Sequence, residues 1–260
     1  MANKQEAIRE NMILAFEHLS NNNPRIAFTR TPNACLAETD IPFPIFNRVF
    51  DYRASEGIDI GEDAKSIAES YHRRGMKCGW HSYSHARDEA VLGALQANGF
   101  VHAGSMSGMS LSLEGRIVAN AEVPGLRIGV IHTDEELEIF KRVFVAEYQL
   151  PDEVAAAVTR IFAYDPKEPQ STRYYLAYLN DEPVGTLMTF DHEDVTGIYT
   201  VATLKEFRSR GIGGAIVAHA LRDRQAAGAK QAILQASAMG QSVYRKLGFE
   251  EKLTIDVYSG

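Results

Sequence analysis

The stretch that decides the fold is Arg208-Ser209-Arg210-Gly211-Ile212-Gly213-Gly214, which carries three glycines in its last four positions. It follows an expected strand and opens an expected helix. Glycines let the backbone approach a ligand closely and adopt conformations that a β-carbon forbids. The first amides of a helix have no internal acceptors, and the helix dipole adds positive charge there. A strand, a glycine-rich loop and a helix in this order predict an anion-binding site, whose usual ligand is a diphosphate.

The residues around this loop alternate between strand-like and helical patterns. Thr133-Asp134-Glu135-Glu136 has the spacing of a capping box, and Gly228 suits a left-handed helix end. The expected elements are a strand at 126–131, helices at 134–148 and from 151, strands at 173–179, 184–190 and 197–203, a helix at 211–227, a strand at 231–236, a helix at 240–246 and a strand at 249–258. This order predicts an α/β (α+β) fold, with helices on the faces of a mixed sheet.

Two motifs indicate which kind of diphosphate-containing ligand the loop would bind. The loop is not the G-x-x-x-x-G-K-[ST] loop of nucleotide phosphatases, nor G-x-G-x-x-G, since residue 216 is isoleucine. Its Arg208-x-x-Gly211-x-Gly213 resembles motif A of the GNAT superfamily of acyl-CoA-dependent N-acyltransferases. Val243-Tyr244-Arg245-Lys246-Leu247-Gly248-Phe249 resembles motif B, and one expected helix and one expected strand separate the two motifs. The stretch before Arg208 resembles the family's central strand and entry loop, except that Lys205 stands where proline is common.

The resemblance implies a role for individual residues, with acetyl-CoA as co-substrate. Main-chain groups of Val201 and Thr203 would pair with the pantetheine arm. The coenzyme A diphosphate would rest on the amides of the loop, which are those of Arg208, Ser209, Arg210, Gly211, Ile212, Gly213 and Gly214. Ser237 stands where the family often has an asparagine that contacts the cofactor, and Tyr244 matches the tyrosine that hydrogen-bonds the thioester sulfur.

The chemistry of thioester aminolysis gives Tyr244 a reason to be there. A thiol has a pKa of about 8.5 and a phenol one of about 10, so a phenol can donate to the departing sulfur. A strand amide near Val201 would stabilise the oxyanion. The base that takes the proton of the amine is not evident. The strand at 198–200 carries no carboxylate, and Asp191–Asp194 is interpreted as a solvated polar loop.

The N-terminal half repeats the order of elements expected in the C-terminal half. We expect a helix at 8–19, a strand at 46–52, a helix at 63–74, a strand at 77–83, a helix at 87–97 and a strand at 101–113. Helix, glycine, strand, helix, Gly-Phe and strand recur after about 150 residues, which indicates a diverged internal duplication. The predicted domains are therefore a GNAT-like domain at 1–117, a linker at 118–125 and the GNAT acetyltransferase domain at 126–260.

The N-terminal copy lacks the chemistry of the C-terminal one. Its counterpart of the phosphate loop, residues 56–63, contains four carboxylates and no Arg-x-x-Gly-x-Gly, and Leu95 aligns with Tyr244. We expect a degenerate, catalytically silent copy that walls the acceptor cleft. Phe43, Phe46 and Trp80 are candidate wall residues, although core packing is the expected role of each.

Composition excludes several other classes of protein. The 260 residues carry a net charge of −7, which argues against a nucleic-acid partner held by phosphate neutralisation. Cys35 and Cys78 form no disulfide framework and are expected to be buried thiols. His81 and His85 have an i, i+4 spacing outside any expected helix, so no metal is predicted. Without a signal peptide or an apolar run of about 20 residues, we expect a soluble, cytoplasmic protein with no membrane partner.

These observations lead to one expected function and two alternatives. The expected enzyme is an N-acetyltransferase that transfers acetyl from acetyl-CoA to a primary amine by direct attack, since no cysteine lies near either motif. The acceptor, a small molecule or a peptide, is not readable from the sequence, nor is the oligomeric state. The first alternative is a non-catalytic acyl-CoA-binding or sensor module, and the second is an ordinary nucleotide-binding domain that would bind ATP or NAD.

Overall fold

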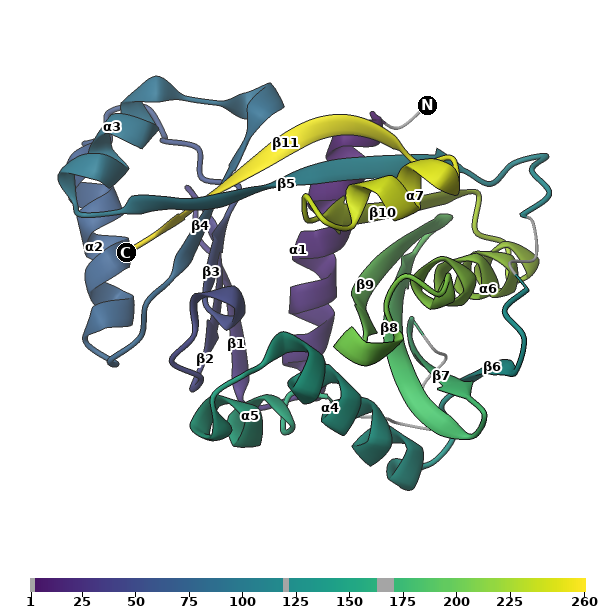
Figure 1. The fold of residues 1–260 in the computed structure, drawn as a ribbon. Coiled ribbons are helices and arrows are strands. Elements are labelled where there is room, and N and C mark those ends of the chain that lie inside the picture. Colours follow the sequence, from purple (N-terminus) through teal and green to yellow (C-terminus); the bar gives the residue numbers. More distant parts are fainter. Residues whose placement is uncertain (1–2, 119–121, 163–170) are drawn as a thin grey trace. The chain divides into compact units, whose positions relative to one another are not determined.

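The computed structural model describes residues 3–118, 122–162 and 171–260, so residues 119–121 of the predicted linker lie outside it. Contacts divide the chain into two compact units. Unit 1 contains residues 1–12 and 108–252, and unit 2 contains residues 13–107 and 253–260. Three elements pass from one unit to the other: α1 (Lys4–Asn22), β5 (Val101–Ser112) and β11 (Glu250–Ser259) (Figure 1). Contacts thus divide the chain elsewhere than at 118–125, and that sequence-level boundary stays a prediction.

Unit 1 is built on a mixed sheet with the strand order β5-β10-β9-β8-β7-β6. Its other strands are β6 (Leu126–Val130), β7 (Thr172–Leu179), β8 (Glu182–His192), β9 (Val195–Thr203) and β10 (Gln231–Ala236). Neighbours from β6 to β9 pair antiparallel, whereas β9 and β10 pair parallel. The predicted order and the α/β class are confirmed.

Helices cover both faces of this sheet. They are α4 (Asp134–Tyr148), α5 (Asp152–Val158), α6 (Ile212–Ala226) and α7 (Gln241–Lys246). Tyr174 and Tyr175 are adjacent on β7 and therefore point to opposite faces. Tyr174 meets Phe140 of α4 edge-on at 5.1 Å between ring centroids, while Tyr175 belongs to the buried cluster formed with the apolar side of α6. The sheet is thus enclosed between α4 and α6.

The helix ends follow the predicted local signals. The hydroxyl of Thr133 accepts a hydrogen bond from the Glu136 amide at 3.2 Å, and the Glu136 carboxylate accepts one from the His132 amide at 2.7 Å. Two amides before and within the first turn of α4 are thereby satisfied by side chains. At the other end of the domain, Gly228 closes α6 with φ +107°, the left-handed conformation that favours glycine.

Three strands of unit 1, β7, β8 and β9, are longer than predicted, whereas β10 has its predicted bounds. β8 extends to His192, which pairs with Val195, so only Glu193 and Asp194 remain in the turn. The expected loop at Asp191–Asp194 was therefore wrong for its first two residues. The preceding hairpin is likewise closed by two residues, Asn180 and Asp181, both with positive φ. Two-residue turns of this kind match the twist of antiparallel strands.

Unit 2 has the strand order β1-β2-β3-β4-β11, followed by the first part of β5. Its remaining elements are β1 (Ile26–Arg30), β2 (Cys35–Thr39), β3 (Arg48–Phe50), α2 (Ile60–His72), β4 (Gly79–Tyr83) and α3 (Glu89–Ala97). The hairpin of β1 and β2 was not predicted, because its five-residue strands show no apolar alternation strong enough to be recognised. Trp80 is almost fully buried in the core of this unit, which settles its role as packing.

Among the helices that the structure describes, none is both long and apolar enough to cross a bilayer. Both cysteines are buried, as expected, and neither forms a disulfide. Burial raises the pKa of Cys78 to about 12.

A buried ion network fixes the last turn of α6. Arg224, which is 2% exposed, donates to Asp191 of β8 at 2.7 Å and to Asp223 at 2.9 Å. Asp223 also accepts a hydrogen bond from the hydroxyl of Tyr175 on β7. The network connects the helix to two strands of the sheet. Removal of the cation would break the ion pair of Asp191, whereas Asp223 would keep its pair with Arg173.

We therefore expect Arg224→Met to lower the free energy of unfolding by about 3 kcal/mol, measured by urea titration. The exposed pair of Lys230 and Asp194, 3.4 Å apart, supplies the control. Lys230→Met should change the same quantity by less than about 1 kcal/mol. Equal effects of the two variants would show that the network does not stabilise unit 1.

Unit 2 contains a histidine that its surroundings keep neutral. His81 on β4 is 4% exposed, and burial, assisted by the Arg48 guanidinium, lowers its pKa. The unfolded chain binds a proton near pH 6.5 and the folded one does not, so stability is complete above that pH and falls as the pH decreases.

The His81→Phe variant should lose less stability than the wild type between pH 7.5 and pH 5. The difference should grow by up to about 1.4 kcal/mol per pH unit below about 6.5, followed by thermal unfolding. His72→Gln, at an exposed position of α2, should leave the pH dependence of the wild type in place. A wild-type stability that does not change over this interval would contradict the assignment.

Candidate functional site

The carboxyl end of β9 separates from its neighbour. The parallel register with β10 ends at Ile198 paired with Leu234, although β9 continues to Thr203. On the β8 side, Thr200 and Val201 lie between the paired residues Tyr199 and Ala202 and together face one residue of β8. This is a β-bulge. An extended ligand could therefore add main-chain hydrogen bonds to the end of β9, beyond its register with β10.

The bulge is strained at one residue. Thr200 has φ +50°, a region that β-branched residues rarely adopt. Its carbonyl accepts a hydrogen bond from the hydroxyl of Thr186 at 3.0 Å, which helps to hold the distortion. Strain of this kind is characteristic of functional sites, and it lies beside Val201, one of the two residues predicted to contact the pantetheine arm.

The glycine-rich loop follows directly. Ser209 and Gly211 both have positive φ, at +62° and +82°, and Gly211 is the N-cap of α6, with no side chain bonded to the cap. A β-carbon at Gly213 or Gly214 would come no closer than 3.5 Å to Thr203 or 3.9 Å to Val243, which is ordinary contact. Packing inside the chain therefore does not require these two glycines. A ligand that lies against the first turn of α6 would require them, because it would occupy the space of a β-carbon.

The corresponding helix start in unit 2 is already occupied. The Asp59 carboxylate caps α2 and accepts hydrogen bonds from the amides of Gly61 at 2.9 Å and Glu62 at 3.1 Å. A carboxylate takes the place that an anionic ligand would need. Leu95, which aligns with Tyr244, is fully buried. Both observations support a silent N-terminal copy.

Tyr244 lies on α7 and presents a protonated phenol. Burial raises its pKa, and the nearby phenol of Tyr148 raises it further. Its ring meets Phe249 at 6.0 Å between centroids, nearly edge-on. Gly240 leaves space for this ring, because a β-carbon there would lie 3.0 Å from Cε2 of Tyr244. At neutral pH this hydroxyl is therefore a hydrogen-bond donor rather than a phenolate.

Ser237 has a structural contact in addition to its predicted one. Its hydroxyl accepts a hydrogen bond from the Gly240 amide at 3.3 Å, and its carbonyl accepts from the amides of Gly240 and Gln241 at 3.0 and 3.2 Å. Ser237 thus accepts from the amides of Gly240, the N-cap of α7, and of Gln241, the first residue of that helix. Its contact with a cofactor stays a prediction.

The two arginines of the loop are used differently. Arg210 is exposed, with its guanidinium over the ring of Phe207 at 5.3 Å. Arg208 donates from Nε to the carbonyl of Thr203 at 3.3 Å and forms an ion pair with Glu147 of α4. Sequence reasoning missed Glu147, since no local pattern connects it to a residue 61 positions away.

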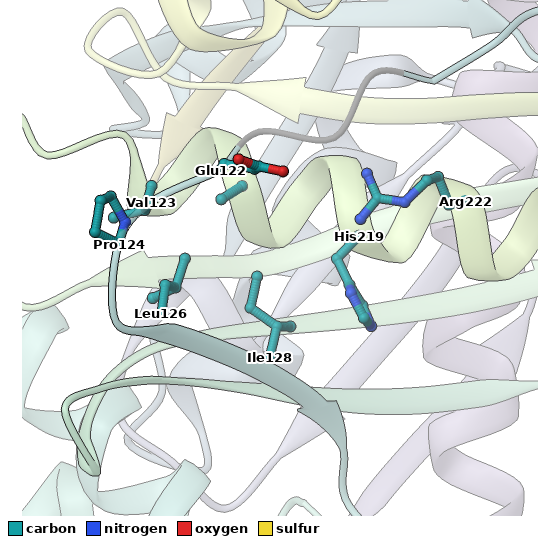
Figure 2. A pocket seen from close by; sticks show the side chains of 8 residues that line it. Glu122, Val123, Pro124, Leu126, Ile128, His219 and Arg222 are labelled. Carbon is teal, nitrogen blue, oxygen red and sulfur yellow. The ribbon is translucent and has the colours of Figure 1, made fainter.

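A cavity of about 320 Å³ lies between α6 and the segment that leads into β6. Its lining includes His219 and Arg222 of the helix and Leu126 and Ile128 of the strand (Figure 2). Within the described ranges, no group of three or more His, Cys, Asp and Glu residues could hold a metal ion. His81 lies on β4 and His85 lies in a three-residue 3-10 helix, so the two do not share an α-helix.

Comparison with known proteins agrees with this geometry. Residues 170–251 match the family model described as the acetyltransferase (GNAT) domain. No curated protein matches the chain.

Solved structures match nearly the whole chain. A GCN5-related N-acetyltransferase from Kribbella flavida is 19% identical and has a TM-score of 0.68, over 97% of this chain and 95% of that one. One from Sphaerobacter thermophilus is 13% identical with a TM-score of 0.66, over 99% and 93%. A tandem GNAT protein from the clavulanic acid biosynthesis pathway is 14% identical with a TM-score of 0.60, over 99% and 94%. These likenesses show a shared fold.

Proposed function

We propose that this protein is an enzyme of the GNAT superfamily that transfers acetyl from acetyl-CoA to a primary amine. Residues 170–251 match the model of the acetyltransferase (GNAT) domain, and solved GCN5-related N-acetyltransferases share the fold. The observation that carries the proposal is the start of α6, whose N-cap Gly211 has no side-chain partner and follows a strand that has parted from its neighbour. The amides supply an anion site and the strand end supplies a place for an extended chain.

The residues present fit coenzyme A. The diphosphate would accept hydrogen bonds from the loop amides of Ser209 to Gly214, with the exposed Arg210 adding positive charge. The predicted amide of Arg208 is not among them, because it donates to the Lys205 carbonyl at 3.3 Å. The pantetheine arm would run along β9 at Val201 and Thr203, in the manner of an added strand. When bound, acetyl-CoA supplies an activated acyl thioester beside the bulge.

The proton donor at Tyr244 and the position of the cysteines support direct attack by the amine. Tyr244 keeps its proton at neutral pH and can donate it to the sulfur as the carbon–sulfur bond breaks. The Val201 amide is the candidate donor to the oxyanion that forms on the carbonyl. The two cysteines lie in unit 2 and are buried, so neither favours an acyl-enzyme.

We expect thiol release from acetyl-CoA in the presence of at least one member of a broad panel of amines. Gly211→Glu should abolish this activity, because a carboxylate at the N-cap excludes the diphosphate. Gly213→Ala should raise the Kd of coenzyme A at least about tenfold, through one or two weakened charge-assisted hydrogen bonds, without loss of thermal stability. Tight binding without turnover across the panel would favour the sensor module, and competition by ATP or NAD would favour a nucleotide-binding domain.

We expect Tyr244→Phe to lower kcat by about 10²- to 10⁴-fold while the Kd of acetyl-CoA changes little. Since burial holds the Tyr244 pKa well above its ordinary value, the wild-type rate should not fall between about pH 8 and pH 10, where an unperturbed phenol begins to lose its proton. An unchanged kcat in the variant would remove Tyr244 from the mechanism.

A further inference from the structure

The bulge in β9 places one peptide group outside the ladders of the sheet. Thr200 and Val201 lie between residues of β9 that pair with β8, and together they face a single residue of that strand. On the other side, the register with β10 has already ended at Ile198. The orientation of the peptide group between Thr200 and Val201 is therefore not set by a regular strand pairing.

A side chain of the neighbouring strand holds this peptide group. Thr186 of β8 is fully buried, and its hydroxyl donates a hydrogen bond to the carbonyl of Thr200 at 3.0 Å. Thr200 has φ +50°, a conformation that is unfavourable for a β-branched residue. The hydrogen bond from Thr186 thus stabilises a backbone conformation that Thr200 would otherwise rarely adopt.

The carbonyl of Thr200 and the amide of Val201 belong to the same rigid unit. A peptide group is planar, and in its trans form the C=O and the N–H point in opposite directions. The described residues contain no cis peptide bond. Because the carbonyl is bonded to a side chain of β8, the N–H of Val201 is directed away from β8.

The side of β9 that faces away from β8 is the side of β10. The two strands are no longer in register at this level, and the pantetheine arm with its acetyl thioester is proposed to lie there. The Val201 amide is the candidate donor to the oxyanion. The contact between Thr186 and Thr200 therefore directs this donor toward the space in which the thioester would react.

We propose that Thr186 is a positioning residue for acyl transfer, because its hydroxyl sets the direction of the Val201 N–H. The inference rests on the proposed function. Thr186 acts through the peptide group and not by contact with the substrate. A donor that is already oriented stabilises the developing negative charge without reorganisation during the reaction. Loss of the hydroxyl should therefore slow the chemical step more than it weakens the binding of the coenzyme.

The first test separates kcat from the Kd of acetyl-CoA. Thr186→Val keeps the shape of the side chain but removes the donor, so kcat with an accepted amine should fall about 10- to 100-fold. The Kd, measured by calorimetry, should stay within about threefold of the wild type, because Thr203 and the loop amides are unchanged. Thr186→Ser keeps the hydroxyl, and its kcat should stay within about threefold of the wild type.

Thr196→Val is the matched control. Thr196 lies on β9 itself and is fully buried, and its hydroxyl has no hydrogen-bond partner among the residues that the structure describes. The variant therefore makes the same substitution at the same burial without touching the bulge. Its kcat should lie within about twofold of the wild-type value.

Two spectroscopic measurements report on the peptide group without turnover. In the free protein, Thr186→Val should shift the amide resonances of Val201, and Thr196→Val should not. In the complex with ¹³C-labelled acetyl-CoA, the infrared band of the thioester carbonyl should lie at a higher wavenumber in Thr186→Val than in the wild type. The reason is that a hydrogen bond to this carbonyl is weakened.

The outcomes distinguish the two proposals. An unchanged kcat in Thr186→Val, or a Kd of acetyl-CoA that rises as much as kcat falls, overturns the inference and leaves the proposed function intact. A Thr186→Ser variant as impaired as Thr186→Val also overturns it, since the hydroxyl would then not matter. Thr186→Ala should lose as much kcat as Thr186→Val, so the test does not depend on the folding of one variant. Absence of coenzyme A binding by the wild type overturns the proposed function, and the role of Thr186 with it.

Discussion

The structure of the proposed site depends on the amides at the start of α6, which the chain itself leaves without a side-chain cap. Such amides are stable only where water or a ligand can reach them, so Ser209, Arg210 and Gly211 lie exposed. The helix behind them is anchored by its apolar side in the core of unit 1 and by Arg224 at its far end. A rigid helix can therefore present an unsatisfied end to an anion without unfolding.

The two copies of the fold show how little separates a binding site from a closed helix end. In α2 the Asp59 carboxylate accepts from two amides of the first turn, which stabilises the helix and repels phosphate. In α6 the same position holds Gly211, with φ +82° and no carboxylate. Because glycine has no side chain, it does not supply the stability that a capping residue supplies. The first amides of α6 are therefore left for a diphosphate to bind.

Charge is balanced locally around the loop although the protein is acidic overall. Arg208 forms an ion pair with Glu147 and donates to the carbonyl of Thr203, whereas Arg210 is exposed. One cation therefore organises the chain and the other faces the solvent, where the diphosphate would lie. Tyr244 on α7 carries no charge at neutral pH, because burial raises the pKa of its phenol.

What the sequence by itself determined is what neighbouring residues decide. The capping box at Thr133, the glycine end at Gly228, the buried strand at 231–236 and the glycine-rich loop each follow from side chains a few positions apart, and the structure contains all of them. The motif pair also predicted a GNAT domain in the C-terminal part, where residues 170–251 match the family model. The roles of the individual residues in binding coenzyme A stay predictions.

Tertiary structure alone decided the rest. The short strands β1 and β2 exist because each pairs with a neighbour, and five residues give too weak a local signal to show it. The extra length of β8 and the bulge at Thr200 depend on the register between β8 and β9, and the contact between Glu147 and Arg208 joins residues 61 positions apart. Register, strand separation and ion pairs are properties of two segments meeting in space, and a pattern read along one segment carries no information about the other.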